Sequence, residues 1–252
     1  MKMIVDNLAI EYLDQGEGPV MVLLHGWASQ AQTFDELASN FIRDYRVLRP
    51  DLPGFGASEK PDDSWGIERY AELVEKWLAK LEVDQVEIMI GHSFGGRVAI
   101  KIASRGVLPI KSLVLLDSAG VKAQQNSRML GFKAAAKAGR AATSLPGLRK
   151  IQDPLRRRLY KAAGTTDYLD AGPLRQIFLN TINEDLLPDA AMIQQPTLLL
   201  YGQNDTETPA DDARKLAAQI RNSRLEILPD AGHFAYQDQL EQTVSLIRKF
   251  CS

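Results

Sequence analysis

Cysteine, histidine and long apolar runs are all scarce in this chain of 252 residues. Its single cysteine, Cys251, excludes an intramolecular disulfide framework and a zinc site built from several thiolates. No uninterrupted apolar run approaches the ~20 residues that a membrane-spanning helix needs, so we expect no stable membrane insertion. With only three histidines, His25, His92 and His233, any imidazole-dependent chemistry must use one of them.

A large net charge is also missing. The formal charge is −2, which argues against a polyelectrolyte binder, so we predict no nucleic-acid partner. The first residues lack the long apolar core of a signal peptide, which favours a cytoplasmic location. The hydrophobic fraction of 45 % is enough to bury a substantial core in a chain of this length. These features predict a globular protein and leave its oligomeric state open.

Apolar runs alternate with helical patterns along most of the sequence. After a hairpin predicted within residues 2–13, predicted strands cover residues 20–24, 45–48, 86–90, 111–117, 196–201 and 224–228. Predicted helices cover residues 31–42 and 67–81, and a further helix is expected to open at Thr208, with that side chain as its cap. The alternation predicts an α/β fold, with a mostly parallel sheet and helices on both faces.

This alternation stops after the predicted strand at 111–117. Residues 118–190 are mainly helical in composition and contain no run typical of a buried strand. We therefore predict that residues 118–190 form a helical cap, or lid, inserted into an α/β core made by residues 1–117 and 191–252.

Basic residues dominate part of the predicted cap. Between Lys122 and Lys161 there are eleven lysines and arginines and one acid, Asp153. Such an excess is compatible with a lid that attracts an anionic substrate or a membrane surface. It is also typical of long basic side chains that cover the solvent face of amphipathic helices, and we favour this second interpretation.

The most informative motif is the segment at residues 91–96, Gly-His-Ser-Phe-Gly-Gly. It lies between a predicted strand and an apolar stretch typical of a helix, which is the context of the G-x-S-x-G nucleophile elbow. Side chains in place of Gly91 and Gly95 would clash in so tight a turn. The turn would project the Ser93 hydroxyl above the sheet, at the positively polarised N-terminus of the next helix.

Polar groups with complementary chemistry follow other predicted strands. Besides Ser93, these are the segment His25-Gly26-Trp27, then Asp205, then His233. Ligands of open parallel sheets bind beyond the carboxyl ends of the strands. The chain order Ser, Asp, His is the order in which proteins with this elbow carry nucleophile, acid and base.

Jointly, these motifs resemble the α/β-hydrolase superfamily across essentially the whole chain. The matching segments are His25-Gly26-Trp27, residues 51–58 (Asp-Leu-Pro-Gly-Phe-Gly-Ala-Ser), residues 91–96, Gly202-Gln203-Asn204-Asp205 and Ala231-Gly232-His233. Together they are highly specific for the fold and much less specific for the substrate. The resemblance covers small microbial serine carboxylesterases and carbon–carbon bond hydrolases with a helical cap.

The resemblance implies a role for each residue of the motifs. Ser93 would attack an acyl carbon, His233 would take its proton and later return one to the leaving group, and Asp205 would orient and stabilise His233. The backbone N–H groups of Trp27 and Phe94 would form the oxyanion hole. No metal site and no organic cofactor are implied, because backbone dipoles do the polarising.

Some of these residues have alternatives. Asp117 ends the strand after the elbow, where some members of the superfamily carry the acid, and we favour Asp205 over it. His25 and His92 are expected to shape the oxyanion turn and the elbow rather than to transfer protons. Residues 51–56 are expected to form a structural turn.

The predicted partner is a small-molecule ester-like substrate with a small or medium acyl group, cleaved through an acyl-enzyme. A serine nucleophile excludes the haloalkane dehalogenases and epoxide hydrolases of the superfamily, which use aspartate there. Candidate substrate-pocket residues are Met129, Phe132, Phe178 and Phe234.

Other reactions stay open as alternatives. They include thioester and lactone hydrolysis and the cleavage of carbon–carbon bonds in vinylogous diketones. The carbon–carbon bond hydrolases usually carry Trp after the catalytic His, and Phe234 at that position weakens this reading. A ligand receptor that keeps the triad and a lipase acting at a membrane surface are further alternatives.

Overall fold

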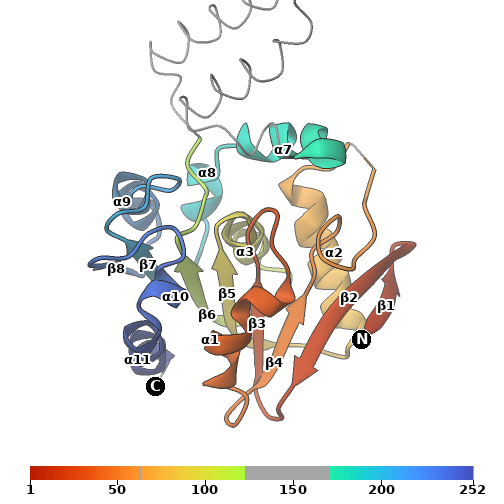
Figure 1. Ribbon diagram of the computed structural model, residues 1–252, viewed down its shortest axis with the longest axis horizontal. Helices are drawn as coiled ribbons and strands as arrows, with labels where there is room; N and C mark the ends of the chain where they lie inside the picture. Colours follow the sequence, from red (N-terminus) through yellow and green to blue (C-terminus); the bar gives the residue numbers. More distant parts are fainter. Residues whose placement is uncertain (63, 123–170, 252) are drawn as a thin grey trace, which may run out of the picture.

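An eight-stranded sheet organises the computed structural model, which describes residues 1–62, 64–122 and 171–251. The strands are β1 (Lys2–Val5), β2 (Leu8–Gln15), β3 (Val20–Leu24), β4 (Arg46–Pro50), β5 (Val86–His92), β6 (Ile110–Leu116), β7 (Thr197–Gly202) and β8 (Ser223–Leu228). Their order in the sheet is β1-β2-β4-β3-β5-β6-β7-β8 (Figure 1). The predicted N-terminal hairpin and the predicted strands are confirmed, with boundaries shifted by one or two residues.

Strand direction places the loops that matter for function. β2 runs antiparallel to both β1 and β4, whereas every pair from β4 through β8 is parallel. The loops after β3, β5, β6, β7 and β8 therefore leave from the same edge of the sheet, where ligands of such folds bind.

Both faces of the sheet are covered by helices. In β3, Val22 and Leu24 belong to one buried cluster and Met21 and Leu23 to the other, because successive strand side chains point to opposite faces. One face is covered by α2 (Ile67–Lys80), α3 (Phe94–Arg105) and α9 (Ala210–Gln219), and the other by α1 (Asp35–Ser39) and α11 (Leu240–Cys251). The short α10 (Ala235–Asp238) follows β8.

The helix predicted over residues 67–81 forms as α2. Its apolar side chains at helical spacing, among them Tyr70, Val74 and Trp77, are almost fully buried against the sheet. Burial of side chains this large stabilises the fold by about 1.5–3 kcal/mol each.

The helix predicted over residues 31–42 is confirmed only over residues 31–39, and not as a single α-helix. The chain forms a short 3₁₀ turn η1 (Ala31–Phe34), then α1, which ends at Ser39. The side chains of Ser39 and Asn40 both donate to the Glu36 carbonyl, at 2.7 and 2.9 Å. These local bonds compete with continued helix formation and end the helix there.

The predicted capping role of Thr208 is also wrong. Helix α9 begins at Ala210 with Pro209 in the capping position, and no side chain caps it. The Thr208 hydroxyl instead lies 2.6 Å from Asp205 Oδ2. A charge-assisted bond to a buried carboxylate is stronger than a bond to a helix N–H group, which explains the change of partner.

Only the two ends of the predicted cap fall among the described residues. Its last part contains η2 (Gly172–Leu174), α7 (Arg175–Ile182) and α8 (Leu187–Ala190). The segment around α8 is held on α3 by the Lys101 ammonium, which lies 2.9 Å from Glu184 and 2.7 Å from Asp189. The division into core and cap stays a prediction.

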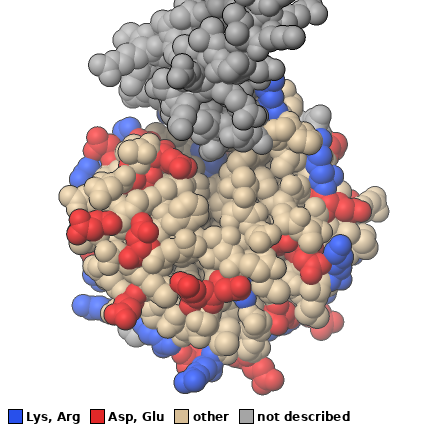
Figure 2. Space-filling model, in the orientation of Figure 1, with Lys and Arg blue, Asp and Glu red and all other residues tan. Residues whose placement is uncertain are grey.

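The surface of the described part of the chain carries basic, acidic and uncharged side chains. Figure 2 shows charged side chains of both signs around a broad area of uncharged ones. No helix within the described ranges has the length and apolar character needed to cross a membrane.

Candidate active site

Ser93 stands at a strained turn between β5 and α3. Its backbone angles are φ 50° and ψ −112°, a region that residues with a side chain rarely adopt. A Cβ atom at Gly91 would lie 2.6 Å from the Gly95 carbonyl oxygen, and one at Gly95 would overlap the Leu24 carbonyl oxygen. The two glycines thus permit the close packing that holds Ser93 above the end of the sheet.

His233 connects Ser93 to Asp205 by two hydrogen bonds. The Ser93 Oγ atom lies 3.0 Å from His233 Nε2, and His233 Nδ1 lies 2.9 Å from Asp205 Oδ2. In the neutral ring, Nδ1–H donates to the carboxylate and Nε2 accepts from the serine hydroxyl. Ser93 therefore meets two side chains that lie more than 100 residues later in the sequence, in one continuous path for a proton.

The Asp205 carboxylate is almost fully enclosed and has several donors. The backbone N–H groups of Glu207 and Thr208 donate to Oδ1 at 2.8 and 3.1 Å, and the Thr208 hydroxyl donates to Oδ2. Burial raises the pKa of Asp205, but the bonds from His233 and Thr208 more than offset this, so the pKa lies below its ordinary value. Asp205 is thus held as the anion.

The pKa of His233 is shifted upward, in the opposite direction to that of Asp205. Burial lowers the pKa of its imidazole, but the hydrogen bond to Asp205 and the charges of Asp205, Glu207 and Asp117 raise it, and the net pKa is raised. The charged form of His233 is therefore more accessible than that of an ordinary imidazole.

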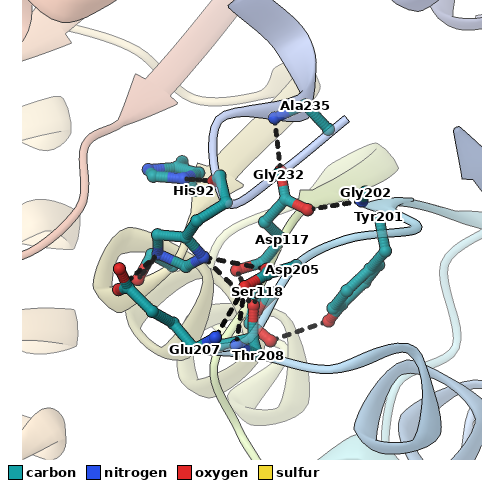
Figure 3. Close-up of polar contacts among 12 residues, drawn as sticks. His92, Asp117, Ser118, Tyr201, Gly202, Asp205, Glu207, Thr208, Gly232 and Ala235 are labelled. Carbon is teal, nitrogen blue, oxygen red and sulfur yellow. Dashed lines mark hydrogen bonds and ion pairs between the residues drawn. The ribbon is translucent and has the colours of Figure 1, made fainter. Parts of the chain in front are cut away.

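Asp117, the alternative acid, faces different partners. Its Oδ1 accepts the Gly202 N–H at 2.7 Å and its Oδ2 accepts the Ala235 N–H at 2.9 Å (Figure 3). Burial raises its pKa to about 7, against the opposing effect of these two donors. Asp205, and not Asp117, is the carboxylate in hydrogen-bond contact with His233.

The two remaining histidines are buried and neutral. Burial lowers the pKa of His25 to about 4 and that of His92 to about 3. His25 Nε2 accepts the Leu52 N–H at 2.9 Å, and His92 Nε2–H donates to the His233 carbonyl at 2.8 Å. Their contacts order backbone near the site, which agrees with the shaping role expected from the sequence.

The two backbone N–H groups predicted for the oxyanion hole lie on adjoining turns. Trp27 follows β3 and Phe94 opens α3, and their rings are 5.3 Å apart. Within the described ranges, neither N–H donates a hydrogen bond. The oxyanion hole built from these two donors stays a prediction.

A groove of about 670 Å³ opens beside this turn. Its lining residues are Trp27, Ala28, Ser29, Gln30, Thr33, Gly54, Phe55, Gly56 and Phe234. Two predicted pocket residues belong to this neighbourhood, since Phe234 lines the groove and Phe178 packs on Trp27 with ring centroids 4.9 Å apart. Met129 and Phe132 lie outside the described residues.

Residues 51–56 do more than form a turn. The Asp51 carboxylate accepts the N–H groups of Ala31 and Ala57, at 2.7 and 2.8 Å, which fixes two loops together. Gly54 and Phe55 then contribute to the groove. The expected structural turn is present, and it also forms one wall beside the site.

Two residues of the site were missed by the sequence reasoning. Thr208 bonds the acid, as above, and Glu207 places a carboxylate oxygen 3.3 Å from His233 Nε2. The available signal was their position, two and three residues after Asp205 on the same turn. Within the described ranges, no group of three or more His, Cys, Asp or Glu side chains has an arrangement that would hold a metal ion.

The chain is similar to known proteins over most of its length. A model of the alpha/beta hydrolase family matches residues 21–246. A pimeloyl-[acyl-carrier protein] methyl ester esterase from Nitrosospira multiformis is 28% identical, over 97% of this chain and 98% of that protein. A 2-hydroxy-6-oxo-2,4-heptadienoate hydrolase from Pseudomonas putida is 26% identical, over 94% of this chain and 90% of that protein.

A solved structure is also similar to nearly the whole chain. The crystal structure of a membrane phospholipase A, described as a bacterial virulence factor, is 26% identical with a TM-score of 0.76. The likeness covers 99% of this chain and 84% of that one. The family match includes Ser93, Asp205 and His233.

Proposed function

The chain belongs to the alpha/beta hydrolase family, and from this premise we propose that it is a serine hydrolase that cleaves a small or medium carboxylic ester. The observation that carries the proposal is the hydrogen-bonded path from Ser93 through His233 to Asp205. Nucleophile, base and orienting acid at these distances form the constellation that activates a serine for acyl transfer.

In the proposed reaction, Ser93 Oγ attacks the ester carbon while His233 Nε2 takes the hydroxyl proton. The tetrahedral intermediate then expels the alcohol, which receives that proton from Nε2. A water molecule attacks the acyl-serine with His233 as base, and the carboxylic acid leaves. Asp205 holds Nδ1–H throughout and stabilises the imidazolium that forms in each half of the reaction.

Backbone donors would stabilise the charge that develops on the ester oxygen. The N–H groups of Trp27 and Phe94 are fixed before the reaction by the turn after β3 and by the start of α3. Loss of one such donor typically lowers the rate by ~10²–10³. Because the backbone supplies both, substitution of the Trp27 side chain tests the groove rather than the oxyanion hole.

The direct test is hydrolysis of p-nitrophenyl acetate and butyrate by the full-length protein. We expect turnover in the wild type and a loss of kcat by about 10⁵–10⁶ in Ser93→Ala, the scale seen when a triad serine is removed. A fluorophosphonate probe should label the wild type at Ser93 and should fail to label the variant.

A matched control is a serine on α3, the helix that follows Ser93. The Ser104 hydroxyl bonds the Lys101 carbonyl at 2.9 Å, away from the site, so Ser104→Ala should keep both turnover and labelling. Turnover that survives in Ser93→Ala would refute the proposal. Saturable ester binding without turnover would favour a receptor.

Carbon–carbon bond hydrolysis is the second candidate. The likeness to the Pseudomonas putida hydrolase named above favours it, and Phe234 beside His233 argues for the ester reaction instead. A panel of esters, thioesters, lactones and 2-hydroxy-6-oxo dienoates compared by kcat/KM separates the candidates. The ester proposal requires the highest values for the simple esters.

A further inference from the structure

The hydroxyl of Thr208 lies where the loops after three neighbouring strands meet. Its oxygen is 2.6 Å from Asp205 Oδ2, 3.0 Å from the Asp117 carbonyl oxygen and 3.3 Å from His233 Nδ1 (Figure 3). Asp117 follows β6, Asp205 follows β7 and His233 follows β8. Thr208 is buried, with 8% of its surface exposed, so its hydroxyl meets these groups rather than solvent.

The single proton of this hydroxyl goes to Asp205. A carboxylate accepts more strongly than a peptide carbonyl, and the Asp205 oxygen is also nearer than that of Asp117. The lone pairs of the Thr208 oxygen then face the Nδ1–H of His233. That N–H is shared unequally, between Asp205 at 2.9 Å and Thr208 at 3.3 Å. The hydroxyl thus favours the same tautomer and the same ring orientation of His233 as the carboxylate does.

Thr208 donates to both oxygens of the Asp205 carboxylate. Its backbone N–H meets Oδ1 at 3.1 Å, and its hydroxyl meets Oδ2. The Glu207 N–H is a second donor to Oδ1, and His233 Nδ1–H is a second donor to Oδ2. Without the hydroxyl, Oδ2 would keep the imidazole as its one donor in the described part of the chain. The carboxylate could then turn more freely away from Nδ1.

The place of the hydroxyl is set by the local sequence. Threonine is branched at Cβ, which restricts its χ1 angle. Pro209 comes next in the chain, and the residue before a proline is held to extended backbone. The Thr208 side chain is therefore oriented before any substrate binds, with little freedom to turn toward another acceptor.

We propose that Thr208 is a positioning residue of the reaction, whose hydroxyl holds the Asp205 carboxylate on His233 Nδ1 and thereby holds Nε2 on Ser93. The inference rests on the proposed ester hydrolysis and deepens it, because it names the side chain that keeps acid and base aligned. The groove beside the site is lined by other residues. Loss of the hydroxyl should therefore lower kcat and leave KM for a small ester unchanged.

The pKa of His233 reports how well the acid is placed. The charged and titratable groups around its ring are Asp205 at Nδ1, Glu207 3.3 Å from Nε2, Asp117, and the neutral His92 with its ring centroid 5.0 Å away. Burial lowers this pKa, and the hydrogen bond and charge of Asp205 are the largest effects that raise it. A carboxylate displaced from Nδ1 raises the pKa less. In Thr208→Val the pKa should fall, so the acid limb of kcat/KM should move to lower pH.

The test replaces the hydroxyl by a methyl group of nearly the same size. In Thr208→Val, kcat for p-nitrophenyl acetate should fall by about 10–100-fold, the scale of one hydrogen bond to a charged group, at unchanged KM. Thr208→Ser keeps the hydroxyl and removes the branch. Since three χ1 rotamers are then open to the hydroxyl, kcat should return to within about threefold of the wild type.

The titration of His233 can also be followed without any substrate. Burial lowers the pKa of His25 to about 4 and that of His92 to about 3, so His233 is the one of the three histidines that titrates near neutral pH. NMR of the full chain with isotope-labelled histidine therefore gives its pKa directly. We expect this pKa to fall in Thr208→Val and to return in Thr208→Ser. A rise in Thr208→Val would show that the hydroxyl only withdraws charge from the carboxylate, and it would overturn the proposal.

Two comparisons separate positioning from general stability. Thr197 is a fully buried threonine at the start of β7, at the other end of this strand from the site, and its hydroxyl donates to the Gln195 carbonyl at 3.0 Å. Thr197→Val should lower thermal stability as Thr208→Val does, but leave kcat and the titration unchanged. In an Asp205→Asn background, Thr208→Val should lower kcat no further, because a residue that acts through Asp205 has no carboxylate left to position.

The outcomes distinguish this inference from the proposed function. If the wild type turns over no ester, the proposed function fails, and the titration alone decides whether Thr208 places the acid. If turnover depends on Ser93 but Thr208→Val keeps both kcat and the pKa of His233, the inference fails and the proposed function stands. The inference fails too if Thr208→Val lowers kcat by the same factor with and without the Asp205 carboxylate.

Discussion

Asp117 and Asp205 are two aspartates that follow neighbouring strands of one sheet. β6 ends just before Asp117, and β7 ends shortly before Asp205. Both residues are buried, with 0% and 5% of their surface exposed. Residue type, place in the sheet and burial are therefore nearly the same.

Their hydrogen-bond partners differ. Asp117 accepts the N–H groups of Gly202 and Ala235, so it ties the end of β7 to the chain just after His233. Asp205 accepts the imidazole itself. The comparison teaches that a carboxylate at the end of a strand can hold loops together or take part in proton transfer, and that the partner decides which.

The largest expected effect on activity comes from replacing Asp205. In Asp205→Asn, the amide cannot hold His233 in the tautomer that accepts a proton from Ser93, and kcat for p-nitrophenyl acetate should fall by about 10⁴. The variant should fold, because its side chain has nearly the same volume. Circular dichroism and thermal unfolding provide the control.

Near-normal kcat in Asp205→Asn, together with a large loss in Asp117→Asn, would exchange the roles of the two aspartates. That result would contradict the proton path described above.

Asp117→Asn should act on stability first. The new amide NH₂ would face the N–H of Gly202 or Ala235, and a buried donor left without an acceptor costs about 1–3 kcal/mol in the free energy of unfolding. Chemical denaturation measures this loss, and kcat should fall by about tenfold or less. The partly exposed Asp212, paired with Lys215 at 2.7 Å, offers the control Asp212→Asn, expected to change stability by about 0–1 kcal/mol.

The smallest effect concerns pH. Asp117 raises the pKa of His233 without a hydrogen bond to it, whereas Glu207 lies 3.3 Å from Nε2. Removal of negative charge at either position lowers the pKa of His233, and the base form then persists to lower pH. The effect is smaller at Asp117, because its own pKa of about 7 leaves it partly protonated on the acid limb. The acid limb of kcat/KM should therefore move down in Asp117→Asn by less than in Glu207→Gln, and a larger or upward shift would contradict this placement of the charges.

Much of the site was predictable because short-range constraints encode it. Gly91 is required because the turn packs it against Gly95 and Gly96, so this part of the motif is set by neighbouring residues. The α/β-hydrolase fold predicted from the motifs is confirmed by the sheet and by the family match. The order of Ser93, Asp205 and His233 predicted their convergence because parallel strands end at one edge.

The remaining features depend on contacts between distant segments. Thr208 resembles a helix cap in the sequence, and only the folded chain shows that its hydroxyl meets Asp205. The direction of the Glu207 side chain depends on where β8 places His233. Asp205 could be favoured over Asp117 from the sequence, but only the folded chain shows that Asp205 contacts His233 while Asp117 accepts the Ala235 N–H.

The bond from His92 to the carbonyl of His233 has a consequence for motion. It anchors the main chain of His233, the proposed base, to the end of β5, next to the proposed nucleophile Ser93. The ring can then turn only about its own side-chain bonds, a short swing between Ser93 and a departing group. The backbone bond from His92 thus limits how far the imidazole can move, and the bond to Asp205 sets its orientation.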